Sequence, residues 1–141
     1  MRVPAARYTR PMADPEDILR FWFEEAGPTR WFKRSDSFDA LCRDRFLATF
    51  EAACRGECWP WRNSPAGRCA EIIVLDQFSR NLFRGLARAF AQDGMALVLA
   101  QEAVGSGADG DMTRDQRYFT YMPYMHSESL AVHEEALRLF T

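Results

Sequence analysis

The sequence lacks the marks of several large classes of protein. Basic residues are not in excess, because 18 Lys and Arg stand against 20 Asp and Glu, and the net charge is −2. A nucleic-acid surface usually depends on such an excess, so we expect no nucleic-acid partner. Apolar runs stay short of the roughly 20 residues that span a bilayer, and the first residues contain no apolar signal-peptide segment. We therefore expect a cytoplasmic protein with no membrane partner.

Motifs for metals and cofactors are missing as well. The four cysteines match neither the C-x2-C pairs of zinc sites nor a redox CxxC motif. His126 and His133 would lie about 10 Å apart along a shared helix, which is too far for them to hold a metal alone. The sequence contains no glycine-rich phosphate loop, dinucleotide fingerprint or nucleophile elbow. We predict free thiols, no metal site and no cofactor.

The pattern of apolar residues indicates helix along nearly the whole chain. The 141 residues are 48% hydrophobic, which is enough for one domain with a sizeable core. Apolar residues recur at intervals of three and four, and no segment alternates for more than a few residues. We predict an all-α fold of antiparallel helix pairs, with residues 1–13 as a disordered tail and residues 14–141 as a single helical domain.

Capping residues and helix breakers mark the ends of the predicted helices. Asp14 followed by Pro15 begins the first, Thr113 with Gln116 forms a capping box for the fifth, and Ser127 is the predicted N-cap of the last. Pro123 is expected to follow the fifth helix. The predicted helices cover about residues 15–26, 37–55, 65–84, 93–104, 113–122 and 127–140.

Residues 75–85, LDQFSRNLFRG, carry a dense polar face on the third predicted helix. Its polar members are Asp76, Gln77, Arg80, Asn81 and Arg84. At 100° per residue they share one side, opposite an apolar stripe. The plain interpretation is a solvated face with a weak Asp76–Arg80 ion pair. The alternative is a binding face. Solvated faces tend to use Lys and Glu, which are absent from residues 72–84, whereas amides and guanidinium groups offer hydrogen bonds of fixed geometry.

The segment 117–128, RYFTYMPYMHSE, gathers a second set of polar residues. In a structural interpretation Ser127 caps the following helix, Glu128 is favoured by the helix dipole, and His126 is a packing residue. In a functional interpretation His126 serves as an acid, a base or an anion ligand, because imidazole takes either protonation state near neutral pH. Ser127 and His126 do not form a hydrolase pair by adjacency, since neighbouring side chains diverge.

These segments, in this order, resemble a bacterial family known only as domain of unknown function 924. The segments that carry the resemblance are ILRFWFEEAG, RWF, FDALCRDRF, IIVLDQFSRNLFRG and RYFTYMPYMHSESL. The resemblance spans about Ile18 to Phe140 and implies a tetratricopeptide-like right-handed array, with a compact helical bundle as the alternative. It implies no established activity. The residues that match the family's polar motifs are Asp76, Gln77, Arg80, Asn81, Arg84, Asp93, His126, Ser127 and Glu128. Such motifs favour the binding face.

The same resemblance implies a difference at the C-terminus. Members of the family usually continue with a further helical region that carries a segment like RFGRFPHRN, whereas this sequence ends at Thr141. We therefore expect Leu130, Leu137, Leu139 and Phe140 to lose part of their cover. A two-fold homodimer that buries the last helix is the expected assembly, because self-complementary patches close most readily with that symmetry.

Three functions remain open from the sequence. The first is a helical module that binds a small molecule or peptide, with the arginines holding its anionic group. Its candidate ligand-binding residues are Gln77, Arg80, Asn81, Arg84, Arg117 and Ser127. The second is a hydrolase-like or other acid–base enzyme, with candidate catalytic residues His126, Asp76 and Glu128. The third is a scaffold without a ligand.

A spatial prediction separates the first two functions from the third. A ligand site needs a groove between residues 75–85 and residues 121–128, in which the face from Asp76 to Asn81 meets His126. It also needs Arg80 or Asn81 to be more than half buried and hydrogen-bonded, because covered guanidinium and amide groups require partners.

Overall fold

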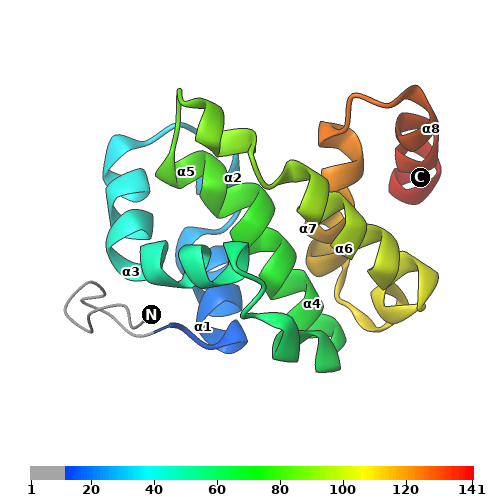
Figure 1. The fold of residues 1–141 in the computed structure, drawn as a ribbon, viewed down its shortest axis with the longest axis horizontal. Coiled ribbons are helices and arrows are strands. Elements are labelled where there is room, and N and C mark those ends of the chain that lie inside the picture. Colours follow the sequence, from blue (N-terminus) through cyan, green and yellow to red (C-terminus); the bar gives the residue numbers. More distant parts are fainter. Residues whose placement is uncertain (1–11) are drawn as a thin grey trace.

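The computed structural model describes residues 12–141, and these residues form helices and turns without a strand (Figure 1). The predicted all-α fold is confirmed. Most of the predicted tail, residues 1–11, lies outside the described residues. The described part of the chain contains no helix that is both long and apolar enough to cross a membrane. The right-handed tetratricopeptide-like arrangement remains a prediction.

The first part of the chain folds into helices that pack around aromatic side chains. They are α1 (Pro15–Leu19), the π-helix η2 (Arg20–Ala26), α2 (Pro28–Trp31) and α3 (Asp36–Cys54). The backbone N–H of Asp14 donates to the Asp17 carboxylate at 3.1 Å, which fixes the start of α1 as predicted. Gly27 ends η2 with φ 68°, a conformation that suits glycine. Between the first two predicted helices, α2 is a short helix that the sequence did not predict.

The middle of the chain forms one long helical rod with a wide turn inside it. Its parts are α4 (Pro65–Ile72), the π-helix η4 (Ile73–Phe78) and α5 (Ser79–Leu82), and the 3-10 helix η3 (Trp59–Asn63) precedes it, separated by the extended Ser64. A π-helix bonds i to i+5, so a constant 100° per residue fails across η4. Every residue of η4 is buried, including Asp76 and Gln77. Leu86, expected on the core stripe, is exposed.

The last part of the chain adds a helical layer on the rod (Figure 1). Its elements are η5 (Ala87–Phe90), α6 (Asp93–Gly105), η6 (Ala108–Asp111), α7 (Arg114–His126) and α8 (Leu130–Phe140). The capping box of Thr113 and Gln116 is confirmed. The predicted end of this helix before Pro123 is wrong, because proline has a helix-compatible φ and costs one backbone hydrogen bond. Ser127 follows α7, and Ser129 caps α8 by accepting from the Val132 N–H.

Aromatic rings hold the helices together in the core. The Phe21 ring lies 4.9 Å from that of Phe46 and 5.9 Å from that of Phe78, which joins η2, α3 and η4. Trp22 meets Phe119 of α7 edge to face at 5.3 Å. Each such ring buries roughly 150–250 Å² and adds directional contacts, so these rings dominate the packing that positions η4 against α7.

Candidate functional site

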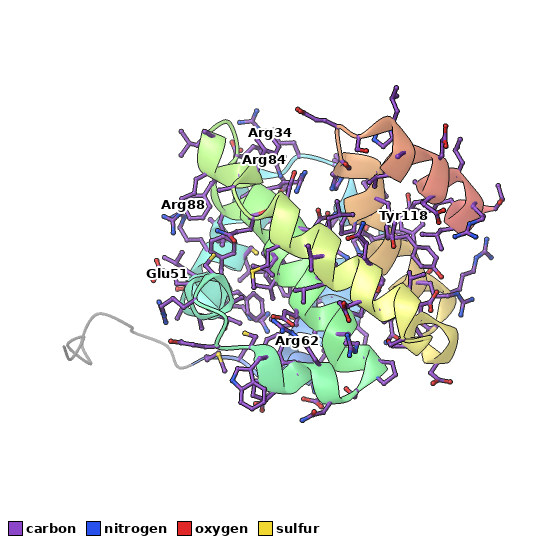
Figure 2. All side chains as sticks on the ribbon, turned by 45° about the vertical axis from the view of Figure 1, so that its right-hand side comes forward. Arg34, Glu51, Arg62, Arg84, Arg88 and Tyr118 are labelled. Atoms are coloured by element: carbon purple, nitrogen blue, oxygen red, sulfur yellow. The ribbon has the colours of Figure 1, made fainter. Side chains whose placement is uncertain are left out.

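A pocket lies where η4 and α5 meet α7 and the segment that follows α2. Its volume is about 170 Å³, and we call it the basic pocket. The lining residues are Arg30, Trp31, Phe32, Lys33, Arg34, Gln77, Arg80, Asn81, Arg84, Met122 and His126. Figure 2 shows Arg34 and Arg84 side by side at one end of the molecule. Residues 75–85 and residues 121–128 therefore meet around one pocket, as predicted, while its role as a ligand site remains a prediction.

Arg80 is fixed in the wall of the basic pocket. Its two terminal nitrogens donate to the two carboxylate oxygens of Asp93, each at 2.9 Å. Nη1 also donates to the backbone oxygen of Asp76 at 2.6 Å, and the guanidinium stacks 5.2 Å from the Phe90 ring centre. The side chain is 22% exposed, which confirms the predicted burial. The guanidinium thus has a defined orientation before any ligand arrives.

Asp39 of α3 holds a second pair of pocket residues. It accepts from Asn81 Nδ2 at 2.8 Å and from Arg84 Nε and Nη2 at 2.8 and 3.1 Å. Burial raises the pKa of Asp39, but the hydrogen bonds from Arg84 and Asn81 and the Arg84 charge outweigh it and set the pKa below its ordinary value. The hydrogen bond to Asp39 raises the pKa of Arg84. Arg84 therefore stays cationic and oriented.

His126 and Asp76 form the third fixed unit. His126 Nδ1 lies 2.8 Å from Asp76 Oδ1, and Gln77 Nε2 donates to Asp76 Oδ2 at 2.8 Å. The Asp76 side chain is completely buried. An ionised carboxylate only accepts hydrogen bonds, so Nδ1 donates to it and a neutral His126 keeps an acceptor at Nε2. Because His126 lines the basic pocket, this arrangement suits proton transfer there, with Nε2 as the proton acceptor.

Three cationic residues of the pocket were missed in the sequence. Arg30, Lys33 and Arg34 lie at the end of α2 and in the turn after it. Lys33 is the only lysine in the sequence and forms no ion pair with a described residue. Arg34 lies 3.6 Å from Asp36, and both side chains are exposed. The run WFKR, residues 31–34, was the available signal, but it lies between two predicted helices and has no helical periodicity of its own.

Four expected site residues do not line the basic pocket: Arg117, Ser127, Glu128 and the buried Asp76, which reaches the pocket only through His126 and Gln77. Arg117 Nη1 donates to the backbone oxygen of Met112 at 2.7 Å, near the other end of α7. It is nine residues before His126, which is roughly 13 Å along a helix. Ser127 accepts from the Ser129 N–H at 3.1 Å, and Glu128 is exposed. Helix α7 continues through Pro123 and ends at His126, so the chain leaves the pocket after His126.

The described residues contain no cluster of three or more His, Cys, Asp or Glu side chains that could hold a metal ion. Among the described residues that line the basic pocket, none is Asp or Glu. The carboxylates of Asp39, Asp76 and Asp93 lie behind the lining, each bonded to a residue that faces it. The lining can therefore offer hydrogen-bond donors and positive charge to a ligand.

The fold and the pocket define an all-helical protein with a preorganised polar site. The model of the family described as bacterial protein of unknown function DUF924 matches residues 18–141, and the chain belongs to this family. The structure is similar to that of a protein of unknown function from Agrobacterium tumefaciens, with a TM-score of 0.85 and 38% identity. The match covers 89% of this chain and 70% of the Agrobacterium chain. No curated protein matches the chain.

Proposed function

We propose that this protein binds a small anionic molecule, of the carboxylate or phosphate class, in the basic pocket. The observation that carries the proposal is the lining itself. Its cationic members are Arg30, Lys33, Arg34, Arg80 and Arg84, with His126 beside them. Arg34, Arg80 and Arg84 are paired with Asp36, Asp93 and Asp39, so the excess positive charge of the lining comes from Arg30 and Lys33, and a bound anion would offset it.

The geometry of the arginines supports this proposal. Arg80 uses Nη1 and Nη2 for Asp93, and Arg84 uses Nε and Nη2 for Asp39. Each guanidinium carries five N–H donors, so donors remain on both after these contacts. A guanidinium already held by a carboxylate loses little conformational entropy on binding, which makes it a good preformed anion ligand.

The single lysine provides the test. Reductive methylation with ¹³C-formaldehyde labels Lys33 and the N-terminal amine, and keeps both cationic. Titration of inorganic phosphate or acetate should shift the Lys33 NMR signal in a saturable manner. Arg34→Gln should weaken binding by about tenfold, because it removes a charged hydrogen-bond donor. Arg20→Gln is the matched control, since Arg20 has a comparable exposed pair with Asp17 and lies outside the pocket.

Two results of the same NMR titration would contradict the proposal. A Lys33 signal that moves no more than the N-terminal signal, with both anions at high millimolar concentration, would contradict anion binding. Equal affinity of Arg34→Gln and wild type would show that the anion binds outside the basic pocket.

A second function is favoured by one observation, the 2.8 Å contact of His126 with the buried Asp76. A buried carboxylate that orients an imidazole towards a pocket is an arrangement suited to general acid–base catalysis. The corresponding candidate is an acid–base enzyme acting on the bound anion, such as a hydrolase. Turnover of p-nitrophenyl phosphate or p-nitrophenyl acetate that disappears in His126→Gln, with anion binding retained, would support it. Binding without turnover of such substrates would favour the binding module.

The scaffold remains the third possibility. The carboxylates of Asp39 and Asp93 join α3 and α6 to α5, so the same bonds also fasten helices together. Absence of both anion binding and turnover would leave this structural role as the explanation of the polar residues.

A further inference from the structure

An apolar groove lies next to the basic pocket, between α7 and α8. Its volume is about 430 Å³. The lining residues are Tyr118, Met122, Met125, Ala136, Leu137 and Phe140, together with His126. Two methionines, two aromatic rings and a leucine form most of this wall. Such a surface is well suited to alkyl chains, because methionine side chains adapt to the shape of an apolar partner.

Two side chains that line the groove are exposed to solvent among the described residues. Leu137 is 67% exposed and Met125 is 49% exposed. Helix α8 lies at the edge of the fold and packs mainly against α7 (Figure 1). Figure 2 places Tyr118 on this side of the molecule, where it meets the Phe140 ring at 5.5 Å. Exposed apolar side chains gathered around a cavity mark a binding surface more often than isolated ones do.

The groove and the basic pocket share two residues. Met122 and His126 line both cavities, and they are four residues apart on α7, which is about 6 Å along a helix. A single short stretch of α7 therefore separates the cationic lining from the apolar lining. A ligand that crosses this stretch meets positive charge on one side and an apolar surface on the other.

We infer that the ligand is a single-chain amphiphile, a medium-chain fatty acid, with its carboxylate in the basic pocket and its alkyl chain in the groove. This inference rests on the proposed anion-binding function and adds the ligand class to it. The basic pocket is the smaller cavity, about 170 Å³ against about 430 Å³, so it suits a head group while the groove suits the chain. His126 lies at the junction, because it lines both cavities.

Chain length gives the first test. Calorimetric titration of the full-length protein with acetate, hexanoate, octanoate and decanoate, below their micelle concentrations, should show affinity rising with length. A fully buried methylene should tighten binding about fourfold, and a half-buried one about twofold. The ¹³C-labelled Lys33 signal should move with every member of the series, since the carboxylate stays in the basic pocket.

Substitutions in the groove give the second test. Leu137→Gln should remove most of the increase in affinity from acetate to decanoate. It should leave the affinity for acetate unchanged. Leu130→Gln is the matched control: Leu130 is on the same helix, is 82% exposed and does not line the groove. It should bind decanoate like wild type. Arg34→Gln should weaken acetate and decanoate by the same factor, because it acts on the head alone.

The outcomes separate this inference from the function on which it rests. Acetate binding that does not improve with chain length would overturn the amphiphile and leave the anion site standing. If neither the acids nor inorganic phosphate bind, both the amphiphile inference and the proposed anion binding are wrong. A decyl phosphate that binds while decanoate does not would show that the head is a phosphate and contradict the fatty acid.

Two further occupants of the groove would also contradict the inference. Light scattering that shows a dimer, dispersed by Leu137→Gln and not by decanoate, would assign the groove to a second copy of the chain. Sedimentation with phosphatidylglycerol vesicles, without saturable binding of monomeric decanoate, would assign it to a membrane surface.

Discussion

His126 and Asp76 are 50 residues apart in the sequence, and their side chains meet at 2.8 Å between α7 and η4. This contact joins the C-terminal end of one helix to the most buried carboxylate of another. It fixes the imidazole at the edge of the basic pocket, and it gives the buried Asp76 carboxylate a further side-chain partner beside Gln77 and Arg80.

Replacement of His126 by alanine should lower the free energy of unfolding by about 1–3 kcal/mol, because Asp76 keeps Gln77 but loses its imidazole partner inside the core. Urea unfolding followed by circular dichroism measures the change. Glu128→Ala is the control and should leave stability unchanged within about 0.5 kcal/mol, since Glu128 is exposed. Equal stability of His126→Ala and wild type would contradict this view of the pair.

Arg80→Lys should lower the free energy of unfolding by about 1–2 kcal/mol, although it preserves the positive charge. The two terminal nitrogens of Arg80 match the two oxygens of Asp93 at 2.9 Å, and an ammonium cannot reproduce that fork. Arg20→Lys on the exposed surface should have no measurable effect. Thermal unfolding of both variants beside wild type checks the prediction, and equal melting temperatures for all three would contradict it.

Acid should weaken the protein partly through Asp39. Its folded-state pKa is below the ordinary 3.8, so its stabilising contribution is complete above 3.8 and is lost as pH falls through the lower folded value. The unfolding free energy of wild type should therefore fall with pH in that range. Asp39→Asn should be less stable at neutral pH and should show a flatter acid dependence. Parallel pH profiles for the two proteins would contradict the role of Asp39.

Gly67→Ala should destabilise the protein by roughly 2–4 kcal/mol. An added Cβ would lie 2.0 Å from the backbone oxygen of Trp61, which cannot move as a flexible side chain can. Gly94→Ala is the matched control on α6, where a Cβ meets nothing within 4 Å and should stabilise by up to about 1 kcal/mol. The two variants should change the free energy of unfolding in urea in opposite directions. A Gly67→Ala variant as stable as wild type would contradict the close contact.

The thiols should react at very different rates. The four cysteines are free, as expected from their spacing. Burial raises the pKa of Cys58 and of Cys69 to about 12, so few thiolates form at pH 8. Cys54 is only partly buried and should be alkylated first by iodoacetamide in the native state. Mass spectrometry of digested samples, compared with labelling in urea, decides the order, and early modification of Cys69 would contradict it.

Most helix ends could be predicted because their signals are local. Ser64 before Pro65 caps α4, and Gly85 follows α5 with φ 83°, both as expected from side-chain capping and glycine conformation. The continuation of α7 through Pro123 could not be predicted, because proline is disfavoured but not excluded inside a helix. Its tolerance there depends on the surrounding packing, which no local signal records.

The site was predictable in part for a similar reason. The polar run from Asp76 to Arg84 and the isolated His126 stood out by residue type, and their meeting is confirmed. Lys33 was missed because it enters the pocket from a turn without periodicity. The carboxylate of Asp39 was missed because its partner Asn81 is 42 residues away, and charge pairing over such distances leaves no pattern in one sequence.

The wide turn of the π-helix η4 determines which side of the rod each side chain of α5 faces. With the number of residues unchanged, ordinary α-helical bonding across Ile73–Phe78 would rotate α5 by about 100° relative to α4. Arg80 and Asn81 would then leave the pocket although no polar residue had been changed. The π-helix accommodates one extra residue in the rod, so a relative with one residue fewer in this segment and ordinary α-helical bonding should keep the same residues facing the pocket.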